Sequence, residues 1–180
     1  NSNLHSSLTI YAQAKGTGEL VMPGVSENFA GIGISDFATL NIHGGIIEAY
    51  GGKYAAGIGG GYQYRGGTVT VYGGSVTARG YSGGSGIGNG SYSSGCSSFT
   101  IYGGKVYAYG SGDNAAGISG NVTVNGGEVN TNNTIGGTDS KVVINDGKVT
   151  IESDRGVIGG NNSTVEINGG DIKVGNNITI

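Results

Sequence analysis

The chain has 180 residues, of which 41 are glycine, 11 are tyrosine, one is cysteine and none is tryptophan, and its formal net charge is −3. The slightly acidic balance gives a nucleic-acid partner no electrostatic attraction, and no apolar run is long enough for a membrane span. One cysteine excludes an internal disulfide, and glycine without a Gly-X-Y period excludes collagen. No signal peptide is recognisable, so the chain is either intracellular or, as we interpret it, a mature or trimmed segment of a secreted protein.

A short segment of alternating apolar residues followed by Gly-Gly or Asp-Gly recurs along the whole chain. The first copy, residues 8–11, is degenerate and lacks the glycines. The later copies occupy residues 40–45, 69–74, 99–104, 122–127, 142–147 and 165–170. Repeats spaced roughly 20 to 30 residues apart indicate a solenoid, in which each unit stacks on the next and extends one core.

Each copy predicts a strand whose side chains alternate between the inside and the outside of the solenoid. The first inward column of the solenoid, formed by these strands, comprises Leu8, Leu40, Val69, Phe99, Val122, Val142 and Val165. A second strand follows the glycines, and its inward column comprises Ile47, Val76, Val106, Val129, Val149 and Ile172. A corner between glycines supplies a third inward column, made of Ile32, Ile58, Ile87, Ile118, Ile135 and Ile158. The glycines act as turn signals because they adopt positive φ without a steric penalty.

We therefore predict an all-β fold, a right-handed parallel β-helix (solenoid) of about seven coils with three short strands per coil. The prediction is a single β-helix domain over residues 1–180. Residues 177–180 resemble the start of another first strand, so we expect that the domain is excised from a longer chain. A bare solenoid end exposes unpaired backbone groups, which suggests end-to-end self-association.

Outward positions form columns as well. In one column, charges of opposite sign alternate along the solenoid, which favours a single stacking register. That column comprises Lys105, Glu128, Lys148 and Asp171. A second column carries aromatic rings in its first half and asparagine in its second half, where we expect a hydrogen-bonded amide ladder. Its members are His43, Tyr72, Tyr102, Asn125, Asn145 and Asn168, so His43 is interpreted as a ladder residue.

The pattern Thr-Val-x-Val/Ile-x-Gly-Gly-x-Val-x-Ala, followed by Gly-Ile-Gly-Gly, extends over nearly the whole chain. It resembles the glycine-rich repeats of bacterial cell-surface β-helix proteins. It is also similar to a family of β-helical carbohydrate-binding domains from plant-degrading and gut bacteria. Members of that family carry an aspartate beside the Gly-Ile corner that helps to hold calcium. The corners at residues 57–60 and 86–89 carry no aspartate here.

Tyrosine is distributed unevenly along the chain. Ten of the 11 tyrosines lie between Tyr50 and Tyr109, where the coils have their longest insertions. Insertions in a solenoid gather on one face, and tyrosine with serine and glycine gives an adaptable surface whose rings stack on sugars. Alternatively, the rings stack on one another and cover loop backbones. The candidate ligand-binding residues are Tyr50, Tyr54, Tyr62, Tyr64, Arg65, Arg79, Tyr81, Tyr92, Tyr107 and Tyr109.

We expect the protein not to be an enzyme. Glycoside hydrolysis requires two closely placed carboxyl groups, and the acidic residues are scattered over different coils. No cofactor is expected either, because calcium would have to bind loop aspartates whose spacing fits no calcium motif. Those aspartates are Asp36, Asp113, Asp139 and Asp154.

The sequence thus predicts a non-catalytic extracellular binding module, attached to the cell surface or secreted. Its expected partner is a polysaccharide or a host or cell-surface glycan, with no nucleic acid. Two alternatives remain open: a passive structural stalk segment of a bacterial adhesin, and an ice-binding β-solenoid. The second is suggested by an outward column that is mostly threonine. That column comprises Thr9, Asn41, Thr70, Thr100, Thr123, Val143 and Glu166.

Overall fold

The structure is a computed structural model that describes residues 5–11, 18–24, 27–93, 97–112 and 115–175. Cys96 and Asp113 lie outside the described residues, as does the segment 177–180 that resembles a further strand. Over the described ranges the chain forms strands, turns and bends, with no helix, and every strand pairing is parallel.

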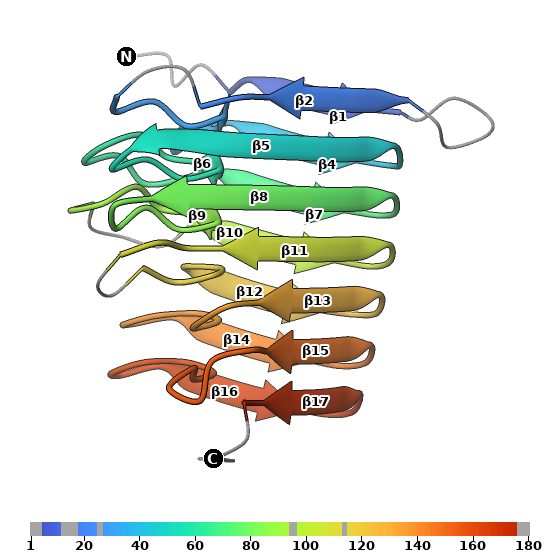
Figure 1. Ribbon diagram of the computed structural model, residues 1–180. Coiled ribbons are helices and arrows are strands. Elements are labelled where there is room, and N and C mark those ends of the chain that lie inside the picture. Colours follow the sequence, from blue (N-terminus) through green and yellow to red (C-terminus); the bar gives the residue numbers. More distant parts are fainter. Residues whose placement is uncertain (1–4, 12–17, 25–26, 94–96, 113–114, 176–180) are drawn as a thin grey trace.

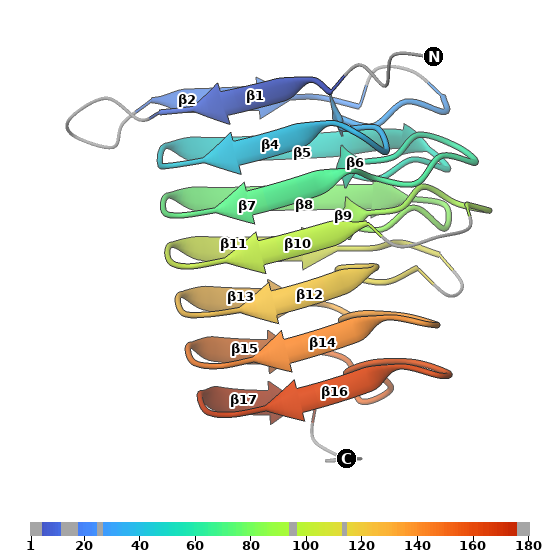
Figure 2. The same ribbon diagram turned by 180° about the vertical axis from the view of Figure 1, so that it is seen from behind.

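Two sheets of seven strands each face one another across the core (Figures 1 and 2). Sheet A contains β1 (Ser7–Ile10), β4 (Thr39–Ile42), β7 (Thr68–Val71), β10 (Ser98–Ile101), β12 (Asn121–Val124), β14 (Lys141–Ile144) and β16 (Thr164–Ile167). Sheet B contains β2 (Glu19–Met22), β5 (Ile46–Lys53), β8 (Ser75–Tyr81), β11 (Lys105–Tyr109), β13 (Glu128–Thr131), β15 (Lys148–Ile151) and β17 (Asp171–Val174).

A narrow third face closes the coil on the side opposite the Gly-Gly turns. Sheet C on this face contains β3 (Ile32–Gly33), β6 (Ile58–Gly59) and β9 (Ile87–Gly88). In the next three turns it shrinks to single parallel bridges at Ile118, Ile135 and Ile158. The chain therefore completes about six turns and ends in a seventh that contributes β16 and β17. The coil is right-handed, as predicted, and runs along sheet A on one side and back along sheet B on the other (Figures 1 and 2).

The core consists of the predicted inward columns stacked in register. Leu40 pairs with Val69, and Ile47 with Val76, so that like residues lie above one another through the molecule. From the second to the sixth turn the columns of the two large sheets are almost completely buried, whereas Ile158 on the third face is partly buried. In the terminal turns the same columns are open, because the described residues cover them on one side only; Leu8 is 48% exposed.

The Gly-Gly turns owe their composition to two constraints that act on one residue. The second glycine of each pair has positive φ, from 79° at Gly127 to 100° at Gly147. A Cβ atom at Gly74 or Gly104 would also lie 2.6 Å from the carbonyl oxygen of the glycine in the preceding turn. Glycine satisfies both constraints, since it tolerates positive φ and allows backbones to approach closely.

The outward columns also form as expected. Glu128 lies 3.4 Å from Lys105 and 3.9 Å from Lys148, and its pKa is lowered by a hydrogen bond from Asn130 and by these two lysines. In the second column the rings of Tyr11, His43, Tyr72 and Tyr102 stack with centroids 4.4–5.3 Å apart. The column continues as an amide ladder, in which Asn168 donates to Asn145 at 2.7 Å and Asn145 donates to Asn125 at 2.8 Å.

Strand β2 was not predicted from the sequence. Leu20 packs against the core and Met22 follows at the next inward position, so the alternation is present. The strand was overlooked because a single glycine, Gly18, precedes it in place of the recurring Gly-Gly pair.

The register of β7 is tested by a matched pair of substitutions. Val71 is completely buried, whereas the neighbouring Thr70 faces outward and is half-buried. Val71→Asp places an unpaired charge in the core and should lower the free energy of unfolding by at least about 4 kcal/mol. Thr70→Asp should cost about 1 kcal/mol or less. Equal losses in urea denaturation would show that the register is wrong.

Candidate functional site

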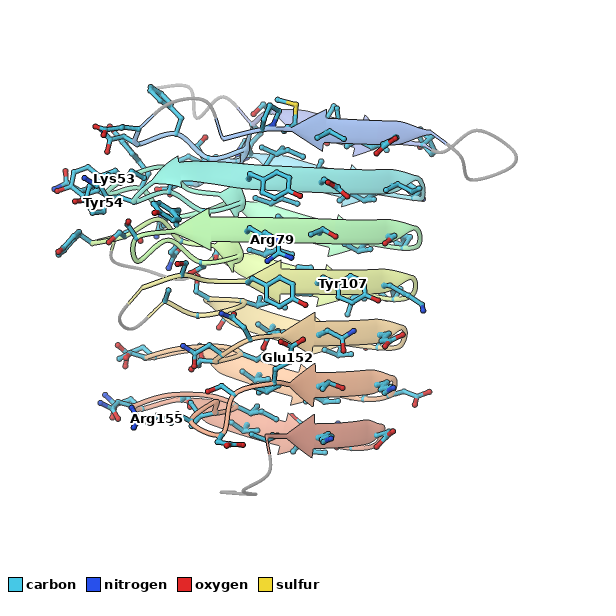
Figure 3. All side chains as sticks on the ribbon, viewed as in Figure 1. Lys53, Tyr54, Arg79, Tyr107, Glu152 and Arg155 are labelled. Carbon is cyan, nitrogen blue, oxygen red and sulfur yellow. The ribbon has the colours of Figure 1, made fainter. Side chains whose placement is uncertain are left out.

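The structure divides the ten candidate residues into two groups on adjoining surfaces. The strand group lies on the outer face of sheet B and comprises Tyr50, Arg79, Tyr81, Tyr107 and Tyr109. The loop group lies in the loops that connect sheet B to sheet C and sheet C to sheet A, and comprises Tyr54, Tyr62, Tyr64, Arg65 and Tyr92. Figure 3 shows Arg79 and Tyr107 on the sheet and Tyr54 at its border. The sequence did not separate the two groups.

Strand pairing aligns three residues of the strand group. Tyr50 on β5 and Tyr109 on β11 both lie in register with Arg79 on β8, which is between them. The Arg79 guanidinium carbon lies 4.4 Å from the centroid of the Tyr109 ring, within the range of a cation–π contact. The guanidinium therefore lies over an aromatic ring.

Two carboxylates flank this stack. The Tyr50 hydroxyl donates to Glu48 Oε2 at 2.9 Å, and the Tyr109 hydroxyl donates to Glu152 Oε1 at 3.3 Å. The hydrogen bond to Glu48, followed by burial, raises the pKa of Tyr50. Burial, followed by the charge of Glu152, raises the pKa of Tyr109. Both phenols consequently remain neutral hydrogen-bond donors at physiological pH.

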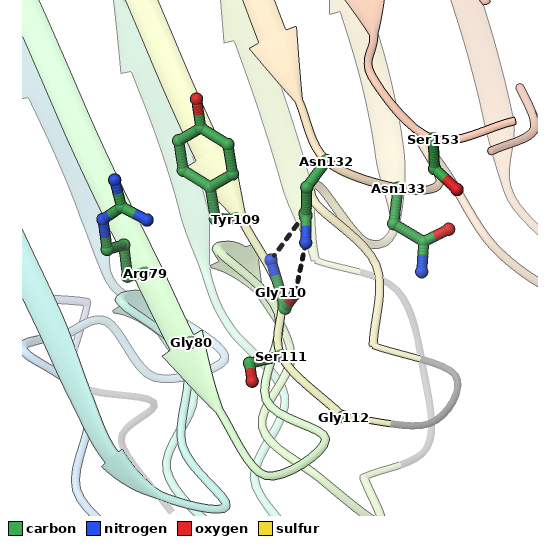
Figure 4. A pocket seen from close by; sticks show the side chains of 9 residues that line it. All are labelled: Arg79, Gly80, Tyr109, Gly110, Ser111, Gly112, Asn132, Asn133 and Ser153. Carbon is green, nitrogen blue, oxygen red and sulfur yellow. Dashed lines mark hydrogen bonds between the residues drawn. The ribbon is translucent and has the colours of Figure 1, made fainter. Parts of the chain in front are cut away.

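A cleft of about 440 Å³ opens beside Arg79 and Tyr109 on sheet B (Figure 4). It lies where the strands of sheet B shorten, from seven residues in β8 to five in β11 and four in β13. Its lining residues are Arg79, Gly80, Tyr109, Gly110, Ser111, Gly112, Asn132, Asn133 and Ser153. The cleft is thus a step between the long and the short turns of the solenoid.

The asparagines of the cleft are fixed in orientation. The Asn132 side chain accepts from the backbone N–H of Gly110 at 3.1 Å and donates to the carbonyl of Gly110 at 2.7 Å, as drawn in Figure 4. Asn133 donates to the carbonyl of Ala115 at 2.9 Å. Neither asparagine was predicted from the sequence, because both lie in a minimal turn and not in one of the long insertions. The only signal was the presence of three asparagines among residues 130–133.

The loop group is organised around Tyr62. Its ring centroid lies 5.4 Å from that of Tyr54 and 6.0 Å from that of Tyr92. The Lys53 ammonium lies 5.0 Å from the Tyr54 centroid. Tyr64 and Tyr92 are 69% and 79% exposed. Part of the alternative interpretation, in which the tyrosine rings contact one another, thus holds, since three tyrosines of the loops do so.

The other predicted positions differ in accessibility. Tyr81 is exposed, whereas Tyr62 and Tyr107 are half-buried. Arg65 forms an ion pair with Asp36 at 2.7 Å, so its guanidinium already has a partner within the loops. Within the described ranges, no group of three or more histidine, cysteine, aspartate or glutamate side chains is placed to hold a metal ion. No helix in that part of the chain is long and apolar enough to span a membrane.

Three segments of the chain match a family model described as a beta helix repeat, at residues 40–62, 69–91 and 99–121. Each match begins in a strand of sheet A and extends beyond the short strand or bridge on the third face. Comparisons with curated proteins and with solved structures give no significant match. The matches and the parallel stacking together fit a β-helix repeat protein.

The two raised tyrosine pKa values respond differently to loss of the partner carboxylate. Glu48→Gln removes the leading cause at Tyr50, so the pKa of Tyr50 should fall toward its ordinary value. Glu152→Gln should leave the pKa of Tyr109 partly raised, since burial is the leading cause there. A pH titration followed by NMR of isotope-labelled tyrosine measures both. Stability that depends on these protonated phenols should be lost as the pH rises through the raised pKa values.

Proposed function

We propose that this β-helix repeat protein is a non-catalytic extracellular module that binds a neutral polysaccharide in the cleft of sheet B. The observation that carries the proposal is the juxtaposition of the stacked Arg79–Tyr109 pair with two oriented asparagines in one polar cleft. Aromatic rings with a few fixed polar groups are the usual means of orienting a ligand in such a site.

The cleft is prepared for binding before a ligand arrives. Arg79 is held against Tyr109, and the Asn132 amide is held by both backbone groups of Gly110. Ordering a side chain on binding costs roughly 0.5–1.5 kcal/mol, so side chains that are already ordered favour affinity. A weakly binding sugar therefore loses little free energy to the ordering of this surface.

The charges around the cleft favour an uncharged sugar. Glu48 and Glu152 flank the stack and outnumber its one cation, Arg79. Carboxylates accept hydrogen bonds from sugar hydroxyls but repel uronates and sulfates. A neutral polysaccharide is thus a better partner than an acidic one.

The spacing of the same carboxylates supports a binding role without catalysis. Glu48 belongs to the second turn of sheet B and Glu152 follows the strand of the sixth turn. At about 4.8 Å per turn, their backbones are roughly 19 Å apart. Catalytic carboxyl pairs of glycosidases are about 5–10 Å apart.

The proposal is tested by affinity electrophoresis with hydroxyethylcellulose, arabinoxylan and galactomannan, and with polygalacturonate as the acidic comparison. Arg79→Ala and Tyr109→Ala should each weaken binding to the preferred neutral polymer by at least about tenfold. The control is Tyr102→Ala, which removes a 53% exposed tyrosine from the other side of the same turn and should leave binding unchanged. If the wild-type protein binds none of the polymers, the passive stalk of an adhesin becomes the better account.

A second candidate function is ice binding, which the outer face of sheet A favours. In the first five turns this face presents two adjacent outward columns of uncharged hydroxyl and amide side chains in strict register. They comprise Ser7, Thr9, Thr39, Asn41, Thr68, Thr70, Ser98, Thr100, Asn121 and Thr123. The array ends at Lys141 and Val143 in the sixth turn. A periodic array of small polar groups suits a periodic ligand such as a crystal surface.

Measurement of thermal hysteresis tests this second function. Thr70→Lys should abolish any hysteresis, because it places a long charged side chain in the middle of the array. Thr77→Lys, on the outer face of sheet B, is the matched control and should have no effect. A wild-type protein without hysteresis would rule out ice binding.

A further inference from the structure

The loops on the third side of the coil contain two corners where the backbone has positive φ. At the first corner, successive turns carry Asn28, Tyr54, Ser82 and Gly112, with φ of 71°, 68°, 50° and 104°. Backbone hydrogen bonds connect these corners from turn to turn, for example from Tyr54 N–H to the carbonyl of Tyr81, which precedes Ser82. At the second corner the residues with positive φ are Gln63, Tyr92, Asp139 and Asn162.

Tyrosine is an unfavourable residue for either corner. Glycine adopts positive φ freely and asparagine or aspartate tolerates it, but a bulky side chain with positive φ is a genuine outlier. Tyr54 and Tyr92 have φ of 68° and 59° at positions where other turns of the solenoid carry residues such as Asn28, Gly112 or Asn162. The corner itself does not require an aromatic ring, and strained residues of this kind cluster at functional sites.

The two strained tyrosines converge on one aromatic surface. Both contact Tyr62, which lies between them, and Tyr92 remains 79% exposed. Tyr92 therefore gains little burial that would offset the backbone strain. An exposed tyrosine ring is, however, well suited to stack on the apolar face of a sugar.

The strands that carry Arg79 and Tyr50 lead from the cleft to the loop group. Beyond the Tyr50–Arg79 pair, the next registered pair of β5 and β8 is Lys53–Tyr81, and a bulge separates the two pairs. Two residues of β8 span about 7 Å, so Tyr81 lies one short step from Arg79 along the strand. Tyr54 follows Lys53 directly, and the Lys53 ammonium lies over its ring. A chain of sugars that leaves the cleft along β8 therefore meets Tyr81 and then the loop tyrosines.

We propose that Tyr54, Tyr62 and Tyr92 form an extension subsite that contacts distal sugars of a neutral polysaccharide held in the cleft. This inference rests on the proposed function of the cleft. The strained corners place the rings of Tyr54 and Tyr92 where a long glycan reaches them and a short one does not. Specificity for chain length follows from this arrangement.

The test compares Tyr92→Asn with Arg79→Ala, using disaccharides and hexasaccharides of the cello-, xylo- and manno- series in isothermal titration calorimetry. Tyr92→Asn should bind the preferred disaccharide within twofold of the wild-type affinity and bind the hexasaccharide at least about tenfold more weakly. Arg79→Ala should lose affinity for both. Because asparagine tolerates the corner, Tyr92→Asn should also keep or raise the melting temperature, by up to about 2–4 °C. Tyr64→Ala, which removes an exposed loop tyrosine with ordinary φ, is the control for general loss of loop aromatic surface.

Each other outcome has a distinct meaning. If Tyr92→Asn binds the hexasaccharide like the wild type while Arg79→Ala does not, the subsite is refuted and the cleft is retained. If Tyr92→Asn also loses the disaccharide, Tyr92 belongs to the primary site and the extension is refuted. A clear fall in the melting temperature of Tyr92→Asn would refute the strain on which the inference depends. If the wild-type protein binds no oligosaccharide of the panel, the function of the cleft and the subsite fail together.

Discussion

Parallel pairing between successive turns is the constraint on which the rest of the structure depends. Neighbouring strands lie about 4.8 Å apart, so each residue meets the equivalent residue of the turns above and below. Identical or similar residues then pack on one another, as Val71 does on Ile42 and Ile101. The same constraint makes Gly74 obligatory, since a Cβ atom there would lie 2.6 Å from the Gly45 carbonyl oxygen of the preceding turn.

The outer surface is free to change its chemistry gradually, because stacking needs only compatible neighbours. One column passes from stacked rings at Tyr72 and Tyr102 to hydrogen-bonded amides at Asn125 and Asn145 without loss of register. The stacked rings cover one another's faces and offer mainly their edges to a ligand. Regular stacking thus gives stability, whereas a cleft opens where it is interrupted. The cleft beside Arg79 lies at such an interruption, where the strands of sheet B become shorter.

The sequence was sufficient to predict the coil, because alternation of period two and the Gly-Gly turns determine strands, faces and register together. It was not sufficient for the site. Asn132 and Asn133 lie in a turn without insertions, and they join Arg79 only because two turns of different length meet there. Nor could the sequence show that Tyr50 and Tyr109 bracket Arg79 while Tyr62 collects the loop rings. Both facts depend on the order of strands in sheet B and on loop conformation, which local patterns do not specify.

We propose above all that a neutral oligosaccharide binds in the cleft at the step in sheet B. Chemical-shift perturbation of the backbone amides during titration with a hexasaccharide tests it most directly. We expect the shifts to be confined to residues 79–81, 109–112, 132–133 and 153 and to the adjoining loop tyrosines. Shifts that instead follow the threonine columns of sheet A, or no shifts at saturating ligand, would contradict it.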